Sequence, residues 1–527
     1  MFFGSAVPGF LLILLLNAIV AVGCTKVGPD FSSPAVQVRD NWLETGNQKL
    51  ATGYDEHREW WRVFKDPALD RLITQAYQEN LTLQQAGVRV LQARAQLGIA
   101  IGGLYPQTQQ GVGVLEKNRV SERGVSQGAT ALNYTRSKLG GEAAWELDFW
   151  GKLRRTVESA DAGLEAAVAG YDSALVTLTA DVANLYLTLR TLEKRLEIAH
   201  NNVETQKEAL EIARFRFEGG VTSMRDVEQA LTVLSSTEAT IPSLEAQIRQ
   251  TQNALCVLLG RPPAQLPELA PGTGVIPAPP PTVAVGIPAD LLRRRPDLRE
   301  AEWQAAAQCA RIGVAKAELF PAFSLRGAFG FTAADVGTFS LADMFQWRSR
   351  EGFGGPSFQW NILNYGRITN LVRVQDARFQ ELLLAYQNLV LKAQQEVEDN
   401  LIAFLKTEDR AKLLGDSTAA AARSLDLAMI QYREGMTDFT TVLTAQQNLL
   451  AQQDSLATSL GDIALSLVGV YRALGGGWHI REGQELVAPE TQAAMARRTN
   501  WGKLLRPVAA PTAEPGQPRK LVRPPQW

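Results

Sequence analysis

The chain has 527 residues and a nearly balanced charge, with 53 Lys and Arg against 55 Asp and Glu. This balance argues against a protein that binds nucleic acid through a basic surface, so we expect no nucleic acid among its partners. The three histidines are scattered and the three cysteines lack metal-like spacing, so neither a metal site nor another cofactor is expected. Beyond the first two dozen residues no apolar run reaches the about 18 residues of a spanning helix, so any further membrane crossing would be made by strands.

Residues 1–23 are typical of a signal peptide. An apolar core from Phe10 to Val22 precedes Gly23 and Cys24, and it is too short for an ordinary anchor. Small residues before the cysteine favour cleavage there and acylation of Cys24; an ordinary secretory signal is the alternative. Two features depart from a lipoprotein signal, because no Lys or Arg precedes the core and Ala21 stands where Leu is favoured. We expect a lipid-anchored segment over 24–68, in the outer membrane.

Two similar stretches, Trp145 to Gly151 and Trp360 to Gly366, lie 215 residues apart. The same offset separates several further pairs: Pro106 and Pro321, Tyr171 and Tyr386, Gly220 and Gly435, and Gly260 and Gly475. A shared offset over so long a span indicates an internal duplication, with repeats over 69–260 and 289–475.

Each repeat is expected to open with a helix and continue with two strands, at about 106–115 and 136–149 and at about 322–331 and 356–363. From Arg136 to Phe149, apolar residues alternate with charged ones, which gives the strand one apolar and one charged face. This pattern favours a transmembrane sheet, and a soluble sheet with one buried face is the alternative. Aromatic residues near the strand ends are expected at the membrane interface: Trp145, Phe149, Phe329, Phe331, Phe358 and Trp360.

Four strands cannot close a barrel, and an open edge in lipid would leave backbone groups unpaired. The protein is therefore expected to be an oligomer whose subunits share one barrel.

After Gly151 and Gly366 the period changes to the heptad spacing of a coiled coil, which predicts helical hairpins over 152–260 and 366–475. A helix over 152–218 would be roughly 100 Å long, too long for a compact domain. Pro242 is expected to kink the returning helix of the first hairpin. An ordinary structural coiled coil is the alternative, but it leaves the strands and the signal unexplained.

Two segments lie outside this pattern. Residues 261–288 are rich in proline and are expected to link the repeats. Residues 476–527 become basic and proline-rich towards their end and are expected to be disordered.

Several motifs resemble those of a known family. They are Cys24-Thr-Lys-Val-Gly-Pro-Asp-Phe31, Leu-Leu-Gly-Arg-Pro262, the stretch from Ile287 to Glu302, Leu319-Phe-Pro321, and the stretch from Tyr471 to Trp478. Over about residues 24–480 the chain resembles the outer-membrane factors of tripartite efflux systems, of the NodT or TolC-like lipoprotein type.

The resemblance implies a mixed α and transmembrane β fold, in which a homotrimer forms a twelve-stranded barrel continuous with a helical coiled-coil barrel. It also implies a passive outer-membrane exit duct for small toxic compounds. The implied partners are a periplasmic adaptor protein, an inner-membrane pump of the resistance-nodulation-division (RND) class, and outer-membrane lipid. A channel for type I export of polypeptides is the alternative within this fold.

The resemblance further implies a gate and adaptor-docking surface at the hairpin turns. The corresponding residues are Gly220, Thr222 and Asp226 in the first hairpin, and Tyr432, Glu434, Gly435, Asp438, Thr441 and Thr444 in the second. Asp226 matches an acidic position of the family. Thr441, Thr444 and Gln447 stand where the family often has two Asp residues and a basic residue, so Asp438 and Glu434 are the candidates to replace them.

Two other classes of protein fit less well. A lipid-attached enzyme would depend on Gly415-Asp-Ser417, but this tripeptide lies in heptad sequence with no preceding strand, and no enzyme is expected. A periplasmic adaptor would carry a single hairpin, whereas this chain repeats its strand pair and hairpin.

Overall fold

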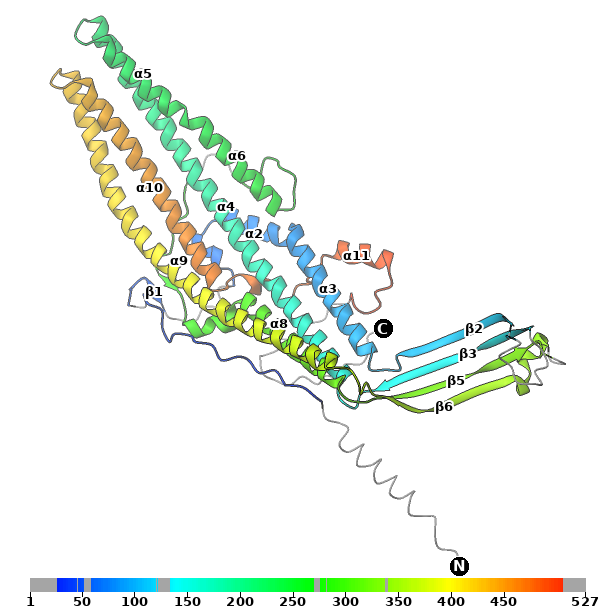
Figure 1. The fold of residues 1–527 in the computed structure, drawn as a ribbon. Coiled ribbons are helices and arrows are strands. Elements are labelled where there is room, and N and C mark those ends of the chain that lie inside the picture. The colour runs from blue at the N-terminus through cyan, green and yellow to red at the C-terminus, as the bar shows by residue number, and fades with distance from the viewer. Residues whose placement is uncertain are drawn as a thin grey trace, which may run out of the picture.

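A computed structural model describes residues 26–44, 46–51, 58–119, 121, 133–269, 275–280, 282–336 and 340–505. The predicted signal peptide and Cys24 lie outside these residues. Long helices extend to one end of the molecule and a four-stranded sheet extends from the other (Figure 1). The described elements are β1 Leu50–Ala51, η1 Trp60–Phe64, α2 Pro67–Glu79, α3 Leu81–Gly102, β2 Thr108–Arg119, β3 Asn133–Leu147, α4 Lys152–Glu218, α5 Met224–Glu238, α6 Thr240–Leu258, β4 Val283–Ala284, η2 Pro288–Asp290, α7 Leu291–Arg294, α8 Pro296–Ala317, β5 Ala322–Ala334, η3 Leu341–Phe345, η4 Trp347–Ser349, β6 Arg350–Gln359, α9 Arg367–Arg433, α10 Phe439–Ala473, η5 Trp478–Arg481 and α11 Pro489–Arg498.

The sheet has the order β2-β3-β5-β6, with every neighbouring pair antiparallel. The two repeats meet where β3 pairs with β5, and β2 and β6 form its edges. The closing strand was expected at about 356–363, and this position is wrong: β6 spans Arg350–Gln359, and Trp360 follows its end. The glycines at 352, 354 and 355 hid this strand, because glycine has a low strand propensity.

The main helices of the two repeats match residue for residue at the offset of 215. α3 corresponds to α8 and α4 to α9, and both α4 and α9 have 67 residues. The one difference lies in the returning helix, which is continuous in α10 but divided into α5 and α6 in the first repeat.

Pro242 accounts for this division. It is the third residue of α6, where a helix tolerates the missing N–H because the first turn has no intrahelical acceptor for it. Its equivalent in α10 is Ala457, which is buried and keeps the helix continuous. The predicted kink is thus a break at Ala239, three residues before the proline.

Glycines with positive φ start both long helices. Gly151 precedes α4 with φ 74° and Gly366 precedes α9 with φ 80°, a region that other residues rarely adopt. Asp148 also stabilises the start of α4, because its carboxylate accepts the backbone N–H groups of Leu153 at 2.8 Å and Arg154 at 3.0 Å. The change from strand to helix is therefore fixed locally in each repeat.

The two largest apolar clusters pack the long helices together. The larger one lies around the middle of α4, where Leu175, Val182 and Leu189 are fully buried and α2, α3 and α10 pack on the helix. The smaller one lies near the hairpin turns and includes Leu210, Val227, Tyr432 and Phe439. Among the described residues, no helix combines the length and the apolar composition that a membrane span requires.

The expectation of a disordered segment from residue 476 is wrong for residues 476–505. The η5 segment is held by Arg481, whose Nη2 donates to the fully buried Asp172 at 2.8 Å. α11 and the residues before it then pack on α3, where Met495 of α11 and the preceding Val487 form an apolar cluster with Leu91. Residues 506–527, which carry most of the prolines of this segment, lie outside the described residues.

Candidate gate and membrane boundary

The predicted gate residues lie at the end of the molecule away from the sheet, where both hairpins turn (Figure 1). Gly220 and Gly435 have φ of 71° and 77°. In each turn a backbone hydrogen bond satisfies a carbonyl at the end of the long helix. Val221 N donates to Arg216 O at 2.9 Å in the first turn, and Met436 N donates to Gln431 O at 2.8 Å in the second. A glycine with positive φ next to such a bond is the usual way to end a helix, so both turns are built alike.

Asp226 lies inside the first turn and does not project from it. Its side chain is only 9% exposed, it accepts a hydrogen bond from Thr222 Oγ1, and Arg225 Nη2 lies 3.6 Å away. The position in the first turn of α5 also suits a carboxylate, because the helix dipole favours negative charge there. Asp226 therefore holds the shape of the turn.

The two turns are joined by a residue that the sequence did not reveal, Arg216 near the end of α4. Its guanidinium donates to the carbonyl oxygens of Tyr432 and Arg433, and its Cζ lies 4.5 Å from the centre of the Tyr432 ring. The last carbonyls of α9 lack helical partners, so a cation from the neighbouring hairpin stabilises them. Tyr432 is 2% exposed and its ring lies 5.1 Å from that of Phe439.

The remaining gate candidates of the second hairpin do not form a charged cluster. Asp438 caps α10, because its carboxylate accepts two hydrogen bonds from Thr441. The backbone N–H of Thr441 donates at 3.2 Å and its Oγ1 hydroxyl donates at 3.1 Å. Thr444 Oγ1 donates to a carbonyl of its own helix at 2.8 Å. Glu434, Asp438, Thr441 and Thr444 are exposed on the single chain.

The predicted interface tryptophans occupy equivalent places at the other end. Trp145 Nε1 donates to Leu104 O at 3.1 Å, and Trp360 Nε1 donates to Leu319 O at 3.0 Å. Both acceptors lie between a helix and the strand that follows it. An exposed ring with a hydrogen-bonded N–H is typical of aromatic residues at a membrane surface.

The sheet has one apolar and one polar face. The apolar face carries Leu139, Trp145, Phe329 and Phe358, which are 37–70% exposed. Phe331 lies on the same face, and its ring centre is 6.0 Å from that of Phe329. Phe149 follows the end of β3, and its ring centre is 5.0 Å from that of Phe323. The polar face carries Lys138, Glu142 and Glu351. The aromatic candidates thus gather on one side of the sheet. Trp145, Phe149, Phe358 and Trp360 lie near its helical end, whereas Phe329 and Phe331 lie in the outer half of β5.

The segment that follows Cys24 is fixed at the boundary between sheet and helices. Arg155, whose side chain is 1% exposed, donates to Val27 O at 3.1 Å and Gly28 O at 3.0 Å and contacts Glu158 at 3.0 Å. Val27 N donates to Trp150 O at 3.1 Å. No sequence pattern indicated this clamp, because backbone carbonyls are its main acceptors.

No group of His, Cys, Asp or Glu suited to a metal ion occurs within the described part of the chain. Cys256 and Cys309 are buried free thiols.

A duplicated unit with a sheet exposed through aromatic residues at one end and paired helical hairpins at the other defines the class of outer-membrane channels with helical tunnels. The sequence profile of the outer membrane efflux protein family matches twice, over residues 72–261 and 287–476, and both limits of the match shift by 215. The chain belongs to the outer membrane efflux protein family. The expected family, the mixed fold and the outer-membrane location as an efflux channel are thereby confirmed.

Individual relatives match over most of their length. Nodulation protein T of Rhizobium leguminosarum bv. trifolii is 30% identical over 461 residues, which are 87% of this chain and 95% of that protein. The toluene efflux pump outer membrane protein TtgC of Pseudomonas putida is 30% identical, with 90% and 97% covered. Among solved structures, the outer-membrane channel OprN is 32% identical with a TM-score of 0.80, covering 86% of this chain and 99% of that one.

Proposed function

We propose that three copies of this chain form a passive exit duct for small toxic compounds across the outer membrane. The observation that carries the proposal is the sheet, which has two unpaired edges, β2 and β6, and an exposed aromatic face. Pairing β2 of one copy with β6 of the next would satisfy the backbone groups of every edge in a closed barrel. The aromatic face would then contact lipid, and the polar face would line the passage.

The names of the relatives favour small molecules as the exported compounds. Their names refer to toluene, antibiotic and pyoverdine export. A passage lined by mixed charges suits conduction, because a solute must be able to leave as well as enter. An RND-class pump in the inner membrane and a periplasmic adaptor would supply the energy and the connection.

The hairpin turns would form the gate and the adaptor-docking surface. Arg216 ties the two turns of one copy together, and Asp226 keeps the first turn compact, so both would hold the closed state. Val221 and Met436, next to the two turn glycines, are 67% and 71% exposed and offer apolar contacts to an adaptor. Asp226→Ala is expected to raise the leak of large solutes through the closed channel.

Acylation of Cys24 would add a lipid anchor near the end of the sheet that joins the helices. Lys26 lies against Gly151, with its Cα 2.9 Å from where a Cβ on that glycine would lie. Two extended residues span at most about 7 Å, so the acyl chains would start close to the boundary between strand and helix.

Reconstitution in a planar bilayer tests the proposal. The lipidated protein should migrate as a trimer after cross-linking and should conduct ions in discrete steps once the gate is opened by Arg216→Ala. A protein that stays monomeric in membranes, or trimers that never conduct in this variant, would overturn the proposed duct.

A further inference from the structure

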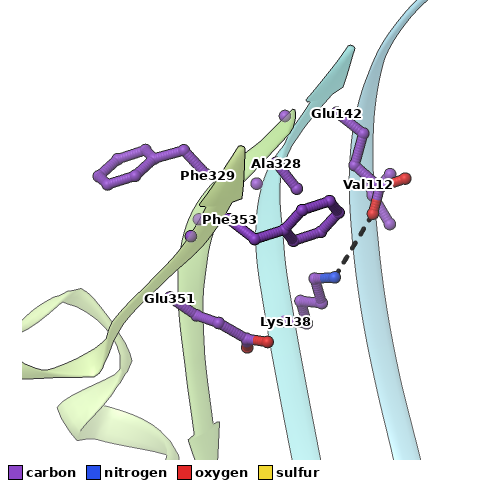
Figure 2. A pocket seen from close by; sticks show the side chains of 11 residues that line it. Val112, Lys138, Glu142, Ala328, Phe329, Glu351 and Phe353 are labelled. Atoms are coloured by element: carbon purple, nitrogen blue, oxygen red, sulfur yellow. Dashed lines mark hydrogen bonds and ion pairs between the residues drawn. The ribbon is translucent and has the colours of Figure 1, made fainter. Parts of the chain in front are cut away.

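A shallow groove crosses all four strands on the polar face of the sheet. It is lined by Val112 of β2, Lys138 and Glu142 of β3, Ala328 of β5, and Glu351 and Phe353 of β6 (Figure 2). Every residue of the groove comes from one chain, so a trimer would carry three complete copies of it. The trimer and the orientation of this face are those of the proposed function, on which this inference rests.

The floor of the groove is a pair of glycines that face each other across β3 and β5, Gly140 and Gly330. A Cβ added to Gly140 would lie 2.8 Å from Gly330 Cα, and one added to Gly330 would lie 2.7 Å from Gly140 Cα. No side chain fits at either position without moving a strand. The close approach of the two strands therefore keeps the centre of the groove open.

The charges along the groove do not cancel. Lys138 Nζ lies 3.4 Å from Glu142 Oε1, which pairs one carboxylate with the one ammonium group of the groove. Glu351 accepts a hydrogen bond from the neutral Thr332 Oγ1 at 2.8 Å. One negative charge thus remains without a compensating cation among the residues that line the groove.

Phe353 places an aromatic ring beside this charge, on the face that carries Lys138 and Glu142. It pairs with Ala328 and is 66% exposed, whereas Phe329 pairs with Gly352 and points to the opposite side of the sheet (Figure 2). Because Glu351 and Phe353 are two residues apart on one strand, their side chains share a face. The negative face of an aromatic ring attracts cations, and a neighbouring carboxylate adds to that attraction.

We infer that this groove binds organic cations, meaning a positively charged group with aromatic or aliphatic substituents, as they pass through the duct. Glu351 attracts the charge, Phe353 contacts the charged group and its apolar substituents, and the glycine pair leaves room for them. Lys138 lowers the affinity by neutralising Glu142. The affinity must be weak, because a strongly bound solute would block the passage.

Channel block measures this binding directly. Benzyltrimethylammonium is added to the outer side of trimers that carry the Arg216→Ala gate opening, and the concentration that halves the conductance is determined. Glu351→Gln should raise this concentration about tenfold and Phe353→Leu about threefold. Lys138→Met should lower it, because Glu142 is then free to attract the cation.

Two controls separate this site from the general electrostatic field of the passage. Glu116 lies on the same face of the sheet but outside the groove, where it pairs with Arg136. Glu116→Gln therefore removes one negative charge from this face and should hardly change the blocking concentration. Benzenesulfonate, an aromatic anion, should not reproduce the block. Equal effects of Glu116→Gln and Glu351→Gln, or weaker block in Lys138→Met, would overturn the inference. Absence of any conductance would instead count against the proposed duct.

Discussion

Arg216 joins the turn of the first hairpin to the turn of the second, although no sequence motif marks this contact. Its equivalent in the second repeat is Gln431, so the contact is not symmetric between the hairpins. Sequence reasoning found Gly220 and Gly435, because tight turns need glycine with positive φ. It missed Arg216, because the acceptors of this guanidinium are carbonyls, which any residue supplies.

Arg216→Ala is expected to open the gate partly. The substitution removes a charged donor from the end of α9 and the cation–π contact with Tyr432, a loss of roughly 1–3 kcal/mol. Cells that lack the pump but express the variant should become sensitive to a large antibiotic such as vancomycin. Arg214→Ala, an exposed neighbour on α4, is the matched control; equal sensitivity of both variants would contradict a specific role for Arg216.

The three cysteines give a direct test of acylation at Cys24. Burial raises the pKa of Cys309 to about 11, so this thiol should resist maleimide at about neutral pH in the folded protein. After denaturation, protein from the outer membrane should label at Cys256 and Cys309 only, because a thioether blocks Cys24. Mass spectrometry counts the labels, and three labels on the mature chain would contradict lipidation.

At the scale of elements, the sequence predicted the long helices well because their heptads persist over many turns. Gly151 and Gly366 also marked the starts of α4 and α9 to the residue. The glycine-rich β6 was misplaced, since its pattern carries few side chains to read. α11 was missed, because its contact with α3 depends on few apolar residues in a charged segment.

Pro242 is expected to make the first hairpin less rigid than the second, because it divides the returning helix into α5 and α6. Pro242→Ala restores an N–H that can bond to Glu238 O, so α5 and α6 should merge into one helix like α10. Hydrogen exchange of the amides over 238–243 should slow at least about tenfold, since exchange follows the free energy of local opening. Ser243→Ala is the control, and unchanged exchange in Pro242→Ala would show that other contacts set the break.

At the scale of the whole molecule, Arg155 connects three parts: the N-terminal segment, the start of α4 and α8. Gly28 permits this contact, because its φ of 95° lets it pack on Gly313, where a Cβ would lie 2.5 Å from Gly313 Cα. The N-terminal segment, the sheet and the long helices thereby meet at one contact.

Arg155→Met should release the N-terminal segment. Removing one partner of a buried charged network costs about 3–5 kcal/mol. The carbonyls of Val27 and Gly28 lose the Arg155 donor, and Glu158 keeps only Lys26, whose Nζ lies 2.8 Å away. Limited trypsin digestion of trimers in membranes should then cut after Lys26 much faster than in the wild type. Arg154→Met, which pairs with Asp148 at 2.9 Å on the more exposed side of the helix, is the control; equal cleavage would show that Arg155 does not hold the segment.

The equal length of α4 and α9 limits how this protein can change by insertion or deletion. Removing one residue from either helix would move its turn by about 1.5 Å and rotate it by about 100°, so Arg216 would no longer meet the carbonyls of Tyr432 and Arg433. A viable change of length must therefore occur in both long helices and both returning helices together. Among relatives, gaps should fall in the loops between strands or in the segments between repeats, and a gap in one long helix should be matched by an equal gap in the other.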